Sequence, residues 1–254
     1  MFNTYVINLD RDVSKWKLIQ NRLREHQITP NRYAAVDARN SEHVQKYRYK
    51  ISNFASYFCP KVPLAIALSH LSLIEHIYKT DTNDFALILE DDVVPNTDNL
   101  IQSIQNVIEG VGDNSWDIIK LHYFFYTNSR KTSYKNYKMT FSAAAYIISK
   151  KAIEILSSEK AYYHYDLQIN FANLRIYKSP QKLFKTFELE TSSNRHTQTF
   201  DSVFKHIKAP FIDTPNGEGL NFWFAFKAIS FCGVELSVLE LIILIVVICL
   251  IIKI

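Results

Sequence analysis

Glycine and cysteine are both scarce in this chain. Only 5 of its 254 residues are glycine, which is well below the average of about 7%. Neither GxGxxG nor GxxxxGK[ST] occurs, so the usual signatures of Rossmann dinucleotide sites and phosphate loops are absent. The three cysteines stand far apart, without CxxC or Cys/His zinc spacing. This spacing argues against a zinc site and favours inert thiols in a reducing compartment.

No signal peptide is expected, because the sequence enters a strand-like pattern directly after its first residues. The long apolar run lies at the other end: residues 236–252 are apolar apart from Ser237 and Glu240. A bilayer-spanning helix needs about 20 such residues. We therefore expect residues 220–254 to form an aromatic linker and a C-terminal membrane-anchor helix, with a buried core helix as the alternative. By default, the preceding domain, residues 1–219, faces the cytosol.

The remaining composition is that of a folded domain, with 48% hydrophobic and 21% charged residues. The net charge of +4 is spread along the chain, so no nucleic-acid partner is expected. Strand-like and helix-like patterns alternate, which predicts an α/β fold with a mainly parallel central sheet flanked by helices. The expected strands are residues 4–9, 33–36, 85–89, 116–121 and 143–148; the expected helices are residues 14–26, 64–78, 97–109 and 150–156.

Three consecutive carboxylates, Glu90, Asp91 and Asp92, directly follow the apolar strand pattern of residues 85–89. Ligands of open α/β sheets bind beyond the carboxyl ends of the strands. Like charges packed there repel one another, and burial raises their pKa values unless a cation compensates them. A magnesium or manganese ion that shares the oxygens of a nucleotide diphosphate supplies that compensation. The pattern therefore predicts a divalent-metal site, with a solvated acidic turn as the alternative.

Five short segments together resemble glycosyltransferase family 25, which includes bacterial lipooligosaccharide galactosyltransferases and collagen galactosyltransferases. They occur in the family's order between residues 3 and 195. The segments are YVINLDR at residues 5–11 with Trp16 beyond it, AAVD at residues 34–37, LSH at residues 68–70, ILEDDV at residues 88–93 and AYIIS at residues 145–149.

The resemblance implies a GT-A fold, a UDP-sugar donor (commonly UDP-galactose), a divalent metal and inversion at the anomeric carbon. By position in the motifs, Asn8, Asp10 and Arg11 would bind at the nucleotide end of the first strand. Asp92, together with Asp91, would hold the metal and through it the donor diphosphate.

The other motif residues, Asp37, Ser69, His70 and Glu90, would complete the donor site. For His70, a hydrogen-bonded core histidine is the competing interpretation. Family members commonly have glycine and cysteine just before the Ser-His pair, whereas this chain has none in residues 63–68. This departure leaves the donor preference open and leaves room for an inactive copy.

An inverting transfer also needs a base that removes the proton of the acceptor hydroxyl. Asp166, a lone acid in an aromatic stretch, is the candidate base, beside Asp91 at the metal; a helix N-cap is the alternative role of Asp166. His196 is a candidate third metal ligand, and a surface histidine is the alternative.

These observations predict a metal-dependent inverting glycosyltransferase that moves a sugar, by resemblance galactose, from a UDP-sugar to a hydroxyl acceptor. The acceptor would be a glycan, a lipid-linked sugar or a protein. Two alternatives stay open: another metal-dependent enzyme such as a nucleotidyltransferase, and an inactive, membrane-tethered partner protein.

Overall fold

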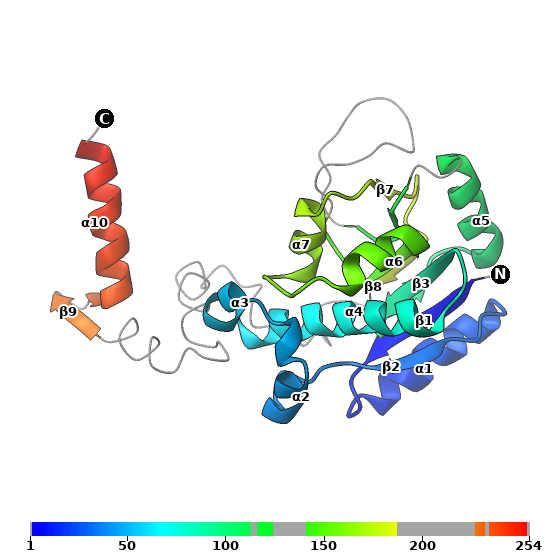
Figure 1. Cartoon of the computed structure of the whole chain (residues 1–254), viewed down its shortest axis with the longest axis horizontal. Helices are drawn as coiled ribbons and strands as arrows, with labels where there is room; N and C mark the ends of the chain where they lie inside the picture. The colour runs from blue at the N-terminus through cyan, green and yellow to red at the C-terminus, as the bar shows by residue number, and fades with distance from the viewer. Residues whose placement is uncertain (1, 113–115, 124–140, 187–226, 232–233, 253–254) are drawn as a thin grey trace.

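A six-stranded mixed sheet forms the centre of the computed structural model, which describes residues 2–112, 116–123, 141–186, 227–231 and 234–252 (Figure 1). The strand order is β2-β1-β3-β6-β5-β7. The strands are β1 (Asn3–Asn8), β2 (Asn31–Ala34), β3 (Phe85–Glu90), β5 (Ile118–Lys120), β6 (Ala145–Ser149) and β7 (Ile176–Lys178). Strand β6 is antiparallel to its neighbours β3 and β5, and the other three pairings are parallel. The predicted mainly parallel α/β sheet is therefore confirmed.

Helices cover both faces of this sheet. They are α1 (Val13–Glu25), α2 (Ser41–Lys46), α3 (Asn53–Phe58), α4 (Lys61–Thr80), α5 (Leu100–Val111), α6 (Lys150–Ser157) and α7 (Tyr165–Phe171), with a 3₁₀ turn at Arg48–Lys50. A hydrophobic cluster lies on each face of the sheet. One cluster packs the sheet against α4, α6 and α7, and the other packs it against α1 and α5. Successive strand residues point to opposite faces, so Ile7 lies in the first cluster and Val6 in the second.

Helix α4 is the most deeply buried of the helices that cover the sheet. Twelve of its 20 residues are buried, so little of its surface remains for the polar stripe of an ordinary amphipathic helix. It begins at the cavity described below and packs with α6 and α7 on one face of the sheet (Figure 1). Functional side chains in its first three turns are therefore mounted on a rigid part of the core.

Two elements near the acidic triplet were not predicted. Strand β4 (Val93–Pro95) directly follows the triplet and pairs antiparallel with β8 (Phe184–Thr186). Each strand has three residues, which is too short for a clear alternating pattern. The pair ties the chain that leaves the triplet to a segment about 90 positions away, so the triplet is held from both sides.

The C-terminal elements differ from the expected anchor. Strands β9 (Lys227–Phe231) and β10 (Val234–Ser237) form an antiparallel pair, and α10 (Val238–Ile252) follows. Because β10 takes Leu236 and Ser237, the helix has 15 residues and a length of about 22 Å, against roughly 30 Å for the hydrocarbon core of a bilayer. Within the described ranges, no helix is long and apolar enough to cross a membrane. The aromatic linker expected at residues 220–226 lies outside those ranges.

The central position of β6 leads to a stability prediction. Ile147 is fully buried in β6, between β3 and β5, whereas Ile155 on α6 is 39% exposed. Replacing Ile147 with Ala should lower the free energy of unfolding by about 2–5 kcal/mol, because a cavity remains in the core. The same change at Ile155 should cost less than about 1 kcal/mol. Urea unfolding of the two variants measures both values, and equal losses would contradict the assigned register of β6.

Candidate functional site

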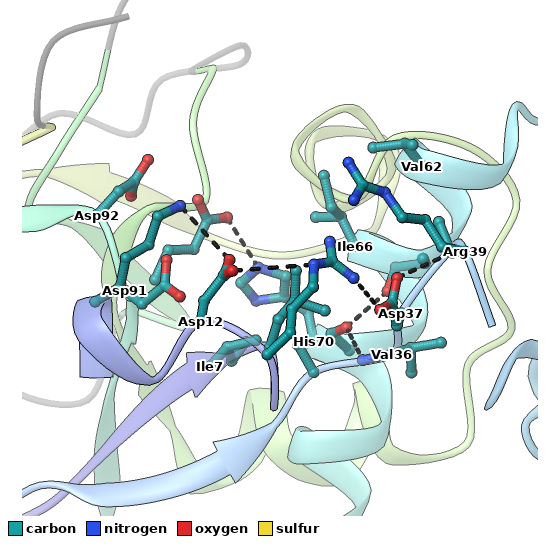
Figure 2. Close-up of a pocket in the computed structure, with 18 residues that line it drawn as sticks. Ile7, Asp12, Val36, Asp37, Arg39, Val62, Ile66, His70, Asp91 and Asp92 are labelled. Atoms are coloured by element: carbon teal, nitrogen blue, oxygen red, sulfur yellow. Dashed lines mark hydrogen bonds and ion pairs between the residues drawn. The ribbon is translucent and has the colours of Figure 1, made fainter. Parts of the chain in front are cut away.

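A cavity lies at the carboxyl ends of β1 and β3, as expected for an open α/β sheet (Figure 2). Its walls come from four segments: the turn from β1 into α1, the loop after β2, the first three turns of α4, and the acidic triplet at the end of β3. The sequence patterns around residues 8–11, 34–37, 69–70 and 90–92 therefore meet in one place, although they are far apart in the chain.

The triplet forms the acidic end of the cavity. Burial is the main reason that the pKa values of Glu90 and Asp92 rise to about 7, and neighbouring carboxylates add to the effect. Burial also raises the pKa of Asp91. The ammonium group of Lys15, on the first turn of α1, opposes all three shifts, and it lies 3.7 Å from Asp12 Oδ2. Excess negative charge thus accumulates at this end of the cavity.

Within the described part of the chain, Asp92 has an unsatisfied hydrogen-bond acceptor in the cavity. Its Oδ1 atom is buried and, among the described residues, makes no hydrogen bond. Such orphaned acceptors are rare in folded proteins and call for an explanation. The described ranges nevertheless contain no cluster of three or more His, Cys, Asp or Glu side chains with the arrangement of a metal site. His196, the candidate third ligand, lies outside the described residues.

Asn8 has a structural role at this site. Its Nδ2 group donates to Asp91 Oδ2 at 2.6 Å and to the carbonyl oxygen of Asp12 at 3.1 Å. Its Oδ1 atom accepts from Arg32 Nε at 2.8 Å. All the polar atoms of this buried amide are therefore engaged by the protein. Asn8 joins β1, β2, the start of α1 and the triplet, and it orients Asp91.

Two further residues of the first motif have different environments. Arg11 lines the cavity and forms an ion pair with Asp37, which also accepts a hydrogen bond from the backbone N–H of Arg39 at 2.9 Å. Asp10 lies outside the cavity lining, is exposed, and pairs with Arg32 at 2.9 Å. The structure thus brings Arg11 and Asp37 to the cavity and leaves Asp10 beside it.

Ser69 and His70 belong to the part of the cavity wall that α4 forms. The hydroxyl of Ser69 accepts from the backbone N–H of Val36 at 2.8 Å and donates to the carbonyl of Ala65 at 2.7 Å. It therefore fastens the loop after β2 to α4. His70 is buried, and its Nε2 atom lies 3.3 Å from Glu90 Oε1. Both residues line the cavity, and both hold other parts of the site in place.

Asp166 lies on the first turn of α7, outside the cavity lining. Its carboxylate accepts from the backbone N–H of Leu167 at 2.9 Å and, more weakly, from that of Ser142 at 3.4 Å. Burial lowers the pKa of Lys120 to about 8, and the nearby charge of Asp166 opposes this shift. The same charge also acts on the pKa values of His70 and Glu90. The N-cap position of α7 belongs to His164, so the cap predicted as the alternative role of Asp166 is wrong by two positions.

Several cavity and neighbouring residues were missed by the sequence patterns. Arg39 and Lys15 line the cavity, but in the sequence they stand among many other basic residues. Lys120 is fully buried, and its Nζ donates to the carbonyl of Ser142. A lysine at the end of a short apolar strand was the available signal, since buried lysines are rare unless they are paired.

Three solved structures match the chain at low sequence identity and with low TM-scores. A glycosyltransferase involved in the glycosylation of the major capsid of PBCV-1 is 12% identical, with a TM-score of 0.35 and 61% of this chain covered; the match spans 62% of that chain, less than two thirds of its length. A mutant of Drosophila β-1,4-galactosyltransferase 7, in complex with manganese, UDP-Gal and xylobiose, is 12% identical, with a TM-score of 0.37 and coverages of 78% and 74%. HddC from Yersinia pseudotuberculosis, complexed with GMP-PN, is 12% identical, with a TM-score of 0.39 and coverages of 73% and 93%.

These scores are too low to decide a donor or an acceptor, and no curated protein matches the chain. The family comparison is more extensive. The model of glycosyltransferase family 25, described as an LPS biosynthesis protein, matches residues 1–208, which include the whole cavity lining. The chain therefore belongs to glycosyltransferase family 25 and is a glycosyltransferase.

Proposed function

We propose that the chain has a GT-A fold and transfers a sugar, with galactose as the first candidate, from a UDP-sugar to a hydroxyl acceptor with inversion. A divalent cation, Mn²⁺ or Mg²⁺, assists the transfer. The observation that carries the proposal is the cavity at the end of β3. There, a buried Asp92 oxygen has no hydrogen-bond partner among the described residues, and the charges of Glu90 and Asp91 act on the same carboxyl.

The two ends of the cavity differ in the way that a nucleotide sugar requires. Asp12, Asp91 and Asp92 stand at one end, while Arg39 lies at the other, beside the apolar side chains of Val62 and Ile66 (Figure 2). An apolar wall suits the face of a nucleobase, and a guanidinium suits ribose or phosphate oxygens. The nucleoside would therefore occupy the Arg39 end and the diphosphate would point toward the carboxylates.

The acidic end fits a hard cation in its chemistry, because carboxylate oxygens are the ligands that Mg²⁺ and Mn²⁺ prefer. Asp92 and Asp91 would hold the ion, and Asn8 fixes the orientation of Asp91. His196 remains a proposed further ligand. When bound, the cation would neutralise charge that develops on the leaving diphosphate. Arg11 would add positive charge near the diphosphate. For this, its ion pair with Asp37 would open, or the guanidinium would be shared between Asp37 and the diphosphate.

Asp166 remains the proposed general base for the acceptor hydroxyl. Its carboxylate is partly exposed and belongs to the electrostatic group of Glu90, His70 and Lys120. Two backbone N–H groups hold it in place. Such an anchored carboxylate next to the donor cavity satisfies the requirement for a positioned base.

The central test is a donor screen followed by a change at Asp92. With Mn²⁺ present, the protein should hydrolyse a UDP-sugar slowly, and UDP-galactose is the first donor to assay. Asp92→Asn keeps the shape but removes the charge, so activity should fall at least about 100-fold, as for the loss of a main transition-state stabiliser. Asp98→Asn, at an exposed acid outside the cavity, is the control and should retain activity.

The outcomes separate the alternatives. Near-native turnover of Asp92→Asn would reject the assigned metal ligand. Binding of UDP without turnover of any donor would indicate an inactive partner protein. Consumption of a nucleoside triphosphate with a sugar phosphate would indicate a nucleotidyltransferase.

The acidic cluster also predicts how stability depends on pH without metal. In the folded protein the pKa of Asp92 rises from 3.8 to about 7. The folded state therefore binds this proton more tightly than the unfolded state, and the resulting stability is present at low pH and lost as the pH rises toward 7. In EDTA, Asp92→Asn should show a smaller loss over this interval, by on the order of 1 kcal/mol. Urea unfolding at several pH values measures it, and a loss equal to that of Asp98→Asn would contradict the raised pKa.

Two residues of the turn after β1 offer a matched pair of variants for testing nucleotide binding. Arg11 lines the cavity and Asp10 does not. Arg11→Ala should weaken UDP and UDP-sugar to the same extent, by roughly 10-fold, because a charge-assisted contact is lost. Asp10→Ala should change both affinities by less than about twofold. Calorimetry with UDP alone and with the UDP-sugar tests this, and a selective loss of sugar discrimination would place Arg11 at the wrong end of the donor.

A further inference from the structure

A second cavity lies at the opposite edge of the sheet from the cavity of the acidic triplet. Its volume of about 520 Å³ is within the range of small-molecule sites. Phe85, at the start of β3, lines this second cavity, whereas Glu90, at the end of β3, lines the first one. A strand of six residues is about 17–20 Å long, and the two linings share no residue among those described. The second cavity is therefore a separate site.

The wall of the second cavity is built from the ends of several elements. They are the start of β3, the end of α5, the residues before β5 and β7, and the junction of β6 with α6. Backbone hydrogen bonds tie these ends together. The N–H of Lys150 donates to the carbonyl of Asp84 at 2.7 Å, and the N–H of Asp117 donates to the carbonyl of Arg175 at 2.9 Å. The fold thus sets the shape of the cavity before any ligand binds.

One part of this wall is apolar. Phe85, Ile108 and Trp116 line it, are partly buried, and pack against the hydrophobic cluster on the α1 and α5 face of the sheet. The rings of Phe85 and Trp116 have centroids 6.2 Å apart and an interplanar angle of 63°, an edge-to-face arrangement that aromatic pairs favour. The indole of Trp116 is therefore held in a fixed position in the wall.

Charged groups of both signs make up most of the polar part of the wall. They are Asp84, Glu109, Lys150, Lys151 and Arg175. The carboxylate of Asp117, which is 1% exposed, accepts from the backbone N–H of Arg175 at 2.7 Å, and its Oδ1 atom lies 3.3 Å from Nζ of Lys151. A buried carboxylate thus fixes two of the three cations, while two acidic side chains stand beside them.

This combination suits a neutral ligand with many hydroxyl groups. A hydroxyl both donates and accepts, so one such ligand satisfies carboxylates and ammonium groups at the same site. A phosphate would meet the like charges of Asp84 and Glu109, which repel it. A wholly apolar ligand would take charged groups out of water without replacing their hydrogen bonds. A sugar ring combines an apolar C–H face, which fits the indole of Trp116, with hydroxyls at its edge.

We propose that the second cavity is a noncatalytic binding site for a neutral saccharide, which packs on Trp116 and bonds to the charged side chains around it. The chain is a glycosyltransferase, so glycans are the polyhydroxylated molecules with which it works. Because the length of β3 separates the site from the acidic triplet, the bound sugar takes no part in bond formation and holds a glycan on the enzyme. This binding does not rest on the proposed donor, metal or base.

Fluorine NMR can observe the site directly. The chain has three tryptophans, so protein labelled with fluorotryptophan should give three signals, and Trp116→Phe and Trp16→Phe samples assign two of them. Maltotriose, cellotriose and lactose are the probes. At least one should shift the Trp116 signal saturably, with a Kd of about 0.1–10 mM, and leave the Trp16 signal in place. UDP and inorganic phosphate should leave the Trp116 signal unchanged.

Three results would overturn the proposal. They are the absence of a saturable shift with all three saccharides, an equal shift of the Trp116 and Trp16 signals, and a saturable shift of Trp116 with phosphate. A protein that transfers no sugar would count against the proposed function, while the fluorine signal would still decide whether the second cavity binds a saccharide.

A set of exposed variants tests the polar part of the wall without disturbing the core. Lys150→Ala and Glu109→Ala each remove one charged group from the lining and should weaken the best saccharide about 3–10-fold, because a hydrogen bond is lost. Lys160→Ala and Glu154→Ala, at exposed residues outside the lining, are the matched controls and should change the affinity by less than about twofold. Unchanged affinity in both lining variants, or equal losses in the controls, would reject the site.

Discussion

Repulsion among the carboxylates at the end of β3 is the constraint on which the site depends. Glu90, Asp91 and Asp92 follow one another where the backbone leaves the sheet, and burial makes their charges costly. Different elements hold two of them: His70 on α4 contacts Glu90, and Asn8 on β1 donates to Asp91. Asp92 has an oxygen left without a hydrogen bond from the described residues. The protein thus compensates part of the charge, and the proposed cation would compensate the rest.

The residues of the family motifs have two kinds of role in this structure: some line the cavity, and others hold neighbouring groups in place. Within the first motif, Asn8 orients other groups and Arg11 faces the cavity. In the Ser-His pair, Ser69 fixes the loop that carries Asp37 and His70 fixes a carboxylate. Residues that a motif presents as ligands can therefore act one step away from the ligand, because a buried polar group must first satisfy its own hydrogen bonds.

Much of the fold could be predicted from the sequence because its central elements are long or strongly apolar. The pattern of residues 85–89 and the helix around residues 64–78 appear where they were expected. The direction of β6 could not be predicted, since an alternating pattern is the same for a parallel and an antiparallel strand. At the C-terminus, the strand β10 takes residues that hydropathy alone assigns to the helix.

The site was predictable to the extent that its residues are adjacent in the chain. The triplet and the Ser-His pair are contiguous, and they could be identified from the sequence. Hydrogen bonds link Tyr165 to Tyr146 and Tyr146 to His70, which are 19 and 76 positions apart in the chain. Nothing in the local sequence marks those tyrosines. Lys120 was also missed, because a lysine in a strand usually faces solvent and here it is fully buried.

The burial of α4 has a consequence for how donor preference can evolve or be engineered. Ala65, Ser69 and His70 face the cavity and are at the same time part of the packed interior, so changes there alter binding and stability together. Ala38 and Arg39 belong to the loop after β2 and line the same cavity, but Ala38 is only partly buried and Arg39 is exposed. Variation that adapts this cavity to a different ligand is therefore tolerated best in this loop, while the helix keeps the scaffold constant.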